Sequence, residues 1–303
     1  MKAFTFCALI LIGIVQFGCH TPGAVYETPE AATAALVDAL SPLSSEKVRT
    51  VLGSQGVDLL QTGDAEADQT MVDRFVTAFR SQHEFITIDD EIVIVEVGDD
   101  GWPLPIPLVR SGQGWRFDTA AGIDEINARR VGRNELDVMQ ACHAIVDAQR
   151  EYAAGGYGGS PGVYASRLRS TPGSRDGLYW ETSDGEPPSP IGPFLADSGF
   201  DPGDASTGSR RSFAGYHFRP LMGQGRFAPG GAMDYVVDGR LTKGFAVIAW
   251  PVEYGETGVM TFMISHSGVL FERDFGPRTA SRVASIHRFD PDPEWTVVPQ
   301  DWE

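Results

Sequence analysis

The stretch that decides the fold reads NELDVMQACHAIVDAQREY over residues 134–152. Its apolar side chains recur at helical steps and share one face with a histidine: Leu136, Met139, His143 and Val146. The helical pattern begins upstream, near Gly122. Gly132 is a point at which this helix could be interrupted, and Asn134 is a fair cap for the segment that follows. The sequence therefore predicts a long amphipathic helix that ends at Tyr152.

Downstream of this helix the sequence changes to a pattern of short strands. The predicted strands are residues 216–220, 232–237, 244–250, 261–264 and 269–272. The last two flank Ser265-His266-Ser267-Gly268 and should form a hairpin. Residues 153–162 and 171–208 are rich in Gly, Pro, Ser and Asp, so we expect them to be irregular. A short helix is expected over 279–287, followed by an extended tail over 290–295.

Upstream of the helix, helical patterns come first and strands second. Thr28 and Ser44 can cap two helices, and a third helix is predicted over residues 64–79. From residue 85 to residue 117 the pattern is that of strands separated by glycine-rich turns. The predicted class is therefore α+β, with N-terminal helices plus an antiparallel sheet, and then a long helix packed on a C-terminal antiparallel sheet.

The first residues have the character of a secretion signal. Lys2 precedes an apolar run, Ala3 to Phe17, that is shorter than a membrane span. Gly18-Cys19 follows, and the pair resembles the cleavage site of bacterial lipoproteins, in which the cysteine becomes the lipidated first residue. The alternative is ordinary cleavage, which would leave Cys19 without a role. We expect export, with residues 1–18 as signal peptide, 19–26 as a tether, 27–121 as a first domain and 122–303 as a second.

The net charge of −17 at pH 7 restricts the partners. Nucleic acids and anionic lipids attract basic surfaces, so neither is expected to bind this chain. No stretch after the signal is long and apolar enough to span a bilayer, so the membrane should be contacted only through the N-terminal lipid. The remaining class of partner is a protein or polymer of the cell envelope.

The sequence contains no catalytic motif that outweighs a structural interpretation. It has no Gly-x-Ser-x-Gly elbow, and the nearest segments, Gly53-Ser54-Gln55-Gly56 and His266-Ser267-Gly268, indicate turns. Cys142 lies inside the helical pattern, where a buried cysteine acts as a small hydrophobe. Its neighbour His143 points about 100° away on a helix, so the pair predicts no zinc site. We therefore predict no catalytic residue and no set of metal ligands.

Two features of the irregular region are candidate binding sites. Asp201 and Asp204 lie in an oxygen-rich loop that could bind calcium, although it lacks the spacing of an EF-hand. Tyr179 and Trp180 lie shortly before the proline-rich segment 187–190. Exposed aromatic residues beside such a segment could bind a partner. The alternative is that they anchor the loop on the sheet.

Motifs along the chain resemble those of one bacterial family. They are Asp99-Asp100-Gly101-Trp102-Pro103, Trp115-Arg116-Phe117-Asp118, Asn134-Glu135-Leu136, Asp147-Ala148-Gln149-Arg150-Glu151-Tyr152, Ser170-Thr171-Pro172-Gly173, Asp176-Gly177-Leu178-Tyr179-Trp180, Ala249-Trp250-Pro251, Glu253-Tyr254-Gly255 and Gly258-Val259-Met260-Thr261-Phe262. In this order they resemble the bacterial domain of unknown function 2950 family over nearly the whole mature chain. That resemblance implies a family but no activity, because the family has no established function.

Two looser resemblances concern the separate halves. Residues 131–287, a long helix followed by loops and a sheet, resemble the head domains of type IV pilins and type II secretion pseudopilins. The helix is too charged for lipid, so the resemblance implies the head fold and not filament assembly. Residues 27–118 resemble the cone folds of nuclear-transport-factor-2-like proteins. The sequence thus favours a non-enzymatic binding or structural protein of the envelope. The alternative is a periplasmic hydrolase with its site in the cavity of the N-terminal domain.

Overall fold

The computed structural model describes residues 21–60, 65–183, 185–192, 194 and 212–299. The chain divides into two compact units, Met1–Ile126 and Asn127–Glu303. Helix α4, Thr119–Gly155, runs from the first unit into the second. Each unit combines helices with antiparallel strands, so the predicted α+β class is confirmed.

In the first unit the helices precede the sheet, as the sequence predicts. The elements are α1 (Pro29–Leu40), α2 (Ser45–Leu52), the 3-10 helix η1 (Asp58–Leu60), α3 (Ala65–Ser81), β1 (His83–Asp89), β2 (Ile92–Val97), β3 (Trp102–Pro103), β4 (Leu108–Ser111) and β5 (Gly114–Phe117). The sheet has the order β1-β2-β4-β5 with β3 beside β2, and all its pairings are antiparallel.

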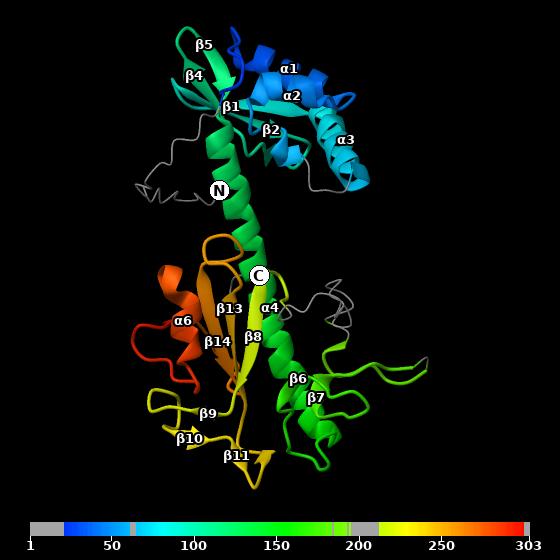
Figure 1. Cartoon of the computed structure of the whole chain (residues 1–303), viewed down its shortest axis with the longest axis vertical. Helices are drawn as coiled ribbons and strands as arrows, with labels where there is room; N and C mark the ends of the chain where they lie inside the picture. Colours follow the sequence, from blue (N-terminus) through cyan, green and yellow to red (C-terminus); the bar gives the residue numbers. More distant parts are fainter. Residues whose placement is uncertain (1–20, 61–64, 184, 193, 195–211, 300–303) are drawn as a thin grey trace. The chain divides into compact units, whose positions relative to one another are not determined.

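Local sequence explains how these helices begin and pack. The side-chain oxygens of Thr28 and Ser44 accept hydrogen bonds from the backbone N–H groups of Ala31 and Lys47, which confirms both predicted caps. The core joins helical and strand residues, among them Leu36, Val48, Val76, Val95, Leu108 and Phe117. This core lies between the helices and one face of the sheet (Figure 1).

The second unit places α4 against a five-stranded antiparallel sheet of order β16-β15-β14-β13-β8. Its other elements are β6 (Arg167–Arg169), β7 (Gly177–Tyr179), β8 (Tyr216–Leu221), β9 (Gly223–Gln224), β10 (Met233–Asp234), β11 (Val236–Val237), β12 (Arg240–Leu241), β13 (Ala246–Pro251), β14 (Met260–Ser265), β15 (Leu270–Asp274), the 3-10 helix η2 (Gly276–Arg278), α6 (Thr279–Ala284) and β16 (Thr296–Val297). Strands β14 and β15 form the predicted hairpin, with Met263 opposite Phe271.

Helices α4 and α6 cover opposite faces of this sheet (Figure 1). Tyr216 and Arg219 are three residues apart on β8, so their side chains point to opposite faces. The Tyr216 hydroxyl reaches Glu135 of α4, whereas Arg219 donates to the carbonyl oxygens of Val283 and Ile286, in and just after α6. Both faces are therefore buried, and all six residues of β13 lie in the interior.

The predicted interruption of the long helix at Gly132 is wrong. Helix α4 is continuous over 37 residues, and Asn134 is not a cap. The Asn134 amide instead donates to the carbonyl oxygen of Thr257 at 2.9 Å. One interior glycine costs a helix only about 1 kcal/mol, which a helix that packs over much of its length can absorb.

Replacing Gly132 with alanine is expected to stabilise the protein by about 0.5–1 kcal/mol. A Cβ at this position would meet no atom within 4 Å, and alanine restricts the unfolded chain more than glycine does. The measurement is the free energy of unfolding in urea. Gly122→Ala in the same helix is the matched control. Its Cβ would lie 2.7 Å from Cγ1 of Ile106, so this substitution should destabilise the protein. Equal effects at the two positions would contradict the prediction.

Two segments are more ordered than predicted. Residues 290–295 are not a free tail: Trp295 is buried and packs edge-on against Phe275, and Thr296 then joins the sheet. In the region expected to be irregular, β6 and β7 pair in parallel, with Arg169 opposite Tyr179. These contacts join segments that local sequence patterns do not connect.

Candidate functional site

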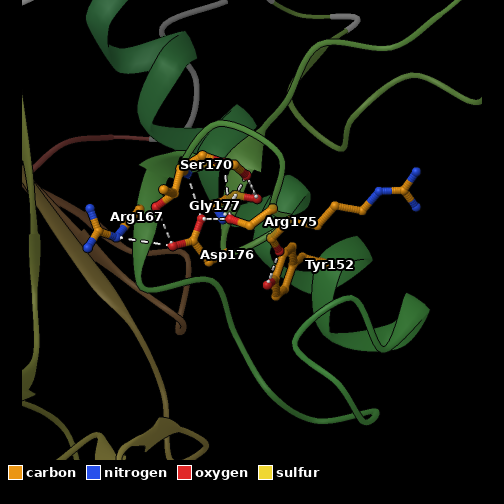
Figure 2. A network of polar contacts seen from close by, with 8 residues as sticks. Tyr152, Arg167, Ser170, Arg175, Asp176 and Gly177 are labelled. Atoms are coloured by element: carbon orange, nitrogen blue, oxygen red, sulfur yellow. Dashed lines mark hydrogen bonds and ion pairs between the residues drawn. The ribbon is translucent and has the colours of Figure 1, made fainter.

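The loop between β6 and β7 is folded around the carboxylate of Asp176 (Figure 2). One carboxylate oxygen accepts from the backbone N–H of Thr171 at 2.7 Å and from the Ser174 hydroxyl at 2.8 Å. The other accepts from the Thr171 hydroxyl at 2.9 Å and lies 3.3 Å from Nε of Arg167. These hydrogen bonds lower the pKa of Asp176 to about 2. The bond from the Thr171 N–H is the main cause, and the bonds from the Ser174 and Thr171 hydroxyls add to it.

Further bonds fix both ends of this loop. The buried Ser170 hydroxyl accepts from the N–H of Gly177 at 2.9 Å and donates to the Gly177 carbonyl oxygen. The Tyr152 hydroxyl of α4 donates to the carbonyl oxygen of Arg175 at 2.6 Å, and burial raises the Tyr152 pKa, which keeps that donor protonated. The loop is therefore held to both the β6–β7 pair and α4.

Replacing Asp176 with asparagine is expected to destabilise the protein by about 1 kcal/mol at pH 7. The side chain of Asp176 is 40% exposed, so solvent screening reduces what its lowered pKa contributes. The folded-state pKa lies below the unfolded one, so this stability is complete above about pH 4 and is lost as the pH falls through about 2. The free energy of unfolding of both proteins should therefore converge in acid. Asp147→Asn, which removes an exposed pair with Arg150, should cost only a few tenths of a kcal/mol.

Beside the loop lies a surface of aromatic and arginine side chains, which we call the arginine–tryptophan surface: Tyr157, Arg169, Arg175, Tyr179 and Trp180. The Arg175 guanidinium lies 5.2 Å from the Trp180 ring centre, and that of Arg169 lies 5.6 Å from the Tyr179 ring centre. The rings of Tyr157 and Trp180 are 5.0 Å apart. Tyr179 and Trp180 are half-buried and pack on the core of the second unit, so these residues serve both as anchors and as part of a surface.

Two hydrogen-bond donors of this surface, Nη1 of Arg169 and the indole Nε1 of Trp180, are shielded from solvent and have no hydrogen-bond partner among the described residues. Such unpaired groups are rare in folded proteins, so each of them calls for an explanation. The sequence alone indicates Tyr179 and Trp180 as candidate binding residues. It does not reveal Tyr157, Arg169 or Arg175, because only the parallel pairing and the loop bring them there.

Three predicted site residues lie outside the described residues. They are Cys19, the predicted lipidation site, and Asp201 and Asp204, the predicted calcium ligands. Among the described residues, no group of three or more His, Cys, Asp or Glu side chains is arranged to hold a metal ion. The lipid anchor and the calcium loop stay predictions.

The Cys142 thiol is fully buried in the core of the second unit. Burial raises its pKa to about 12, so the reactive thiolate is scarce at neutral pH. We expect a mature protein with Cys19→Ser to react with a thiol reagent only as fast as it unfolds. Full reaction in urea is the control, and rapid labelling of the native protein would contradict the burial.

Two histidines of the second unit are packed against aromatic rings. His217 lies against Trp250, with ring centres 5.5 Å apart, and His266 contacts Tyr235 and Phe245 edge-on. The Nδ1 atoms of His217 and His266 are shielded and without a partner among the described residues. Among the described residues, neither Nδ1 atom is hydrogen-bonded to a hydroxyl or thiol that it could activate.

The alternative function places a hydrolase site in a cavity of the first unit. The buried polar side chains there are Thr33, Asp68 and Thr119, and the two threonines donate to the backbone oxygens of Pro29 and Leu52. A groove of about 520 Å³ is lined by Thr70, Asp73, Arg74, Thr77, Ala78, Ser81, Gly98 and Asp99. None of the described helices has the length and apolar content needed to cross a bilayer.

The fold and site define a two-unit α+β protein whose second unit carries an arginine- and aromatic-rich surface on a hydrogen-bonded loop. Residues 23–298 match the family model described as Protein of unknown function (DUF2950), and the chain belongs to this family. Searches of curated proteins and of solved structures found no match. The family resemblance seen in the sequence is therefore confirmed, whereas the pilin-like and cone-like resemblances are not.

Proposed function

We propose that this chain is an exported protein of the bacterial cell envelope that binds a protein partner and does not catalyse a reaction. Lys2 and the apolar run that follows support export, and Cys19 supports a lipid anchor that would hold the protein at the periplasmic side of a membrane or in the envelope.

The observation that carries the binding proposal is the arginine–tryptophan surface. Trp, Tyr and Arg are the residue types that dominate the energetics of protein–protein interfaces. Here they are presented on a loop that Asp176 and Tyr152 hold in place, which reduces the entropy lost on binding. The buried Cys142 thiol and the ring-packed histidines are consistent with binding in place of catalysis.

Recovery of a partner by surface variants tests this proposal. Detergent extracts of the native envelope are passed over the wild-type protein, Trp180→Ala and Phe227→Ala, and bound proteins are identified by mass spectrometry. Phe227 is a matched control because it is an exposed aromatic that also carries an arginine, Arg226, over its ring. A partner retained by wild type and Phe227→Ala but lost with Trp180→Ala supports the proposal. Equal recovery by all three, or no specific protein, contradicts it.

Mass spectrometry of the mature N-terminus tests export separately. The expected product begins at Cys19 and carries lipid, and Cys19→Ser should release the protein from membranes. Recovery of intact residues 1–18 on the native protein would contradict export.

A further inference from the structure

Three arginines lie within nine residues at the β6–β7 pair, and two of them are neutralised. Arg167 pairs with Asp176 at 3.3 Å, and Arg169 pairs through Nη2 with Glu181 at 3.1 Å. Arg175 is exposed and faces no carboxylate among the described residues. In a chain of net charge −17, Arg175 is thus a positive charge that no acid of this loop neutralises.

The structure holds Arg175 apart from the carboxylate of its neighbour in sequence, Asp176. Both Asp176 oxygens are directed into the loop by Thr171, Ser174 and Arg167. Figure 2 shows the Arg175 side chain extending away from these contacts, while its carbonyl oxygen is bound by Tyr152. The guanidinium lies over Trp180 at 5.2 Å, which leaves the N–H groups at its edge available.

We infer that Arg175 binds a carboxylate group of the protein partner. The inference rests on the proposed binding function and adds the chemistry of the partner. The Arg175 guanidinium is exposed and can only donate hydrogen bonds, so the complementary ligand supplies acceptors. A carboxylate matches the guanidinium with two parallel hydrogen bonds. The partner segment carries few charges, because the acidic body of this protein repels a dense polyanion.

The chemistry can be tested without the partner. The probe is a hexapeptide with blocked ends that carries a single glutamate among glycines and serines, titrated against the full mature protein, and the readout is the NMR signal of the Trp180 indole N–H, assigned with Trp180→Phe. The wild type should give a saturable shift, and the same peptide with glutamine in place of the glutamate should give none. Arg175→Gln should weaken binding at least about tenfold, and Arg175→Lys, which keeps the charge but loses the planar fork, should weaken it less. Arg226→Gln is the control, because Arg226 also lies over an aromatic ring, at 4.6 Å from the Phe227 ring centre.

The outcomes separate this inference from the proposed function. An unchanged titration with Arg175→Gln, or an equal loss with Arg226→Gln, overturns the inference. The methyl glycoside of galacturonic acid, a carboxylated sugar with one negative charge, is the second arm, and tighter binding of this probe than of the peptide would overturn the assignment to a protein. Partner recovery from envelope extracts that fails with Trp180→Ala but persists with Arg175→Gln would overturn the inference and leave the proposed function intact.

Discussion

Replacing Gly258 with alanine is expected to lower the free energy of unfolding by about 3 kcal/mol or more. A Cβ at this position would lie 2.0 Å from the Tyr216 hydroxyl oxygen and 2.4 Å from two carbons of its ring. Tyr216 is fully buried, and its ring packs against Phe262. It cannot move away without losing its hydroxyl contact, at 3.0 Å, with the Met260 carbonyl oxygen. The clash therefore disrupts the packing of the core of the second unit.

Urea denaturation of matched glycine variants measures this effect. Gly255→Ala is the control in the same turn, where the added Cβ meets no atom within 4 Å but the backbone has φ +81°. That backbone conformation alone costs about 1–2 kcal/mol for a side chain. Gly258→Ala in a Tyr216→Phe background should remain destabilised, because the ring carbons stay in place. A Gly258→Ala protein as stable as Gly255→Ala would show that the turn and Tyr216 are not packed as described.

The parts of the fold that depend on local chemistry could be predicted from the sequence. Thr28 and Ser44 act as caps because a hydroxyl next to free N–H groups needs no distant partner. The β14–β15 hairpin follows from two apolar strands and the short turn at Ser265–Gly268. The predictions that failed concern residues whose partners are far away in the sequence. Asn134 is a residue type that often caps helices, but its hydrogen-bond partner Thr257 is 123 residues away.

The candidate site was predictable only in part, for the same reason. Tyr179 and Trp180 are large aromatics in a polar region, which is a signal that one sequence can carry. Arg175 becomes distinctive only when Asp176 is seen to bind Thr171 and Ser174 instead of it. Among many charged residues, the sequence does not show which acid neutralises which base.

The second large effect is expected at Glu135, where alanine should destabilise the protein by about 2–3 kcal/mol. A single carboxylate oxygen of Glu135 accepts from the backbone N–H groups of Val259 at 2.8 Å and Met260 at 2.9 Å, and lies 3.3 Å from the Tyr216 hydroxyl. These bonds join α4 to β8 and to the start of β14. Alanine would leave two half-buried N–H groups without their acceptor, and this is costlier than losing a paired interaction.

Glutamine at position 135 separates the hydrogen bonds from the charge. Its amide oxygen can still accept both N–H groups, so Glu135→Gln should cost only about 1 kcal/mol. The exposed Glu151 lies on the same helix, and Glu151→Ala should change stability by no more than about 0.5 kcal/mol. If Glu135→Ala were as stable as Glu151→Ala, the carboxylate would not be holding α4 to the sheet.

The charge of Glu135 also has a separate signature in pH dependence. Burial, and then the negative charge of Glu135, raise the pKa of Glu272 above its ordinary value. A raised folded-state pKa contributes stability below the unfolded pKa, and that contribution is lost as the pH rises through the folded pKa. Glu135→Gln removes one of the two causes, so the Glu272 carboxyl, followed by NMR, should titrate at lower pH and the loss of stability with rising pH should shrink. An unchanged Glu272 titration would leave burial as the only cause of its shift, and would mean that Glu135 acts on this sheet through its hydrogen bonds alone.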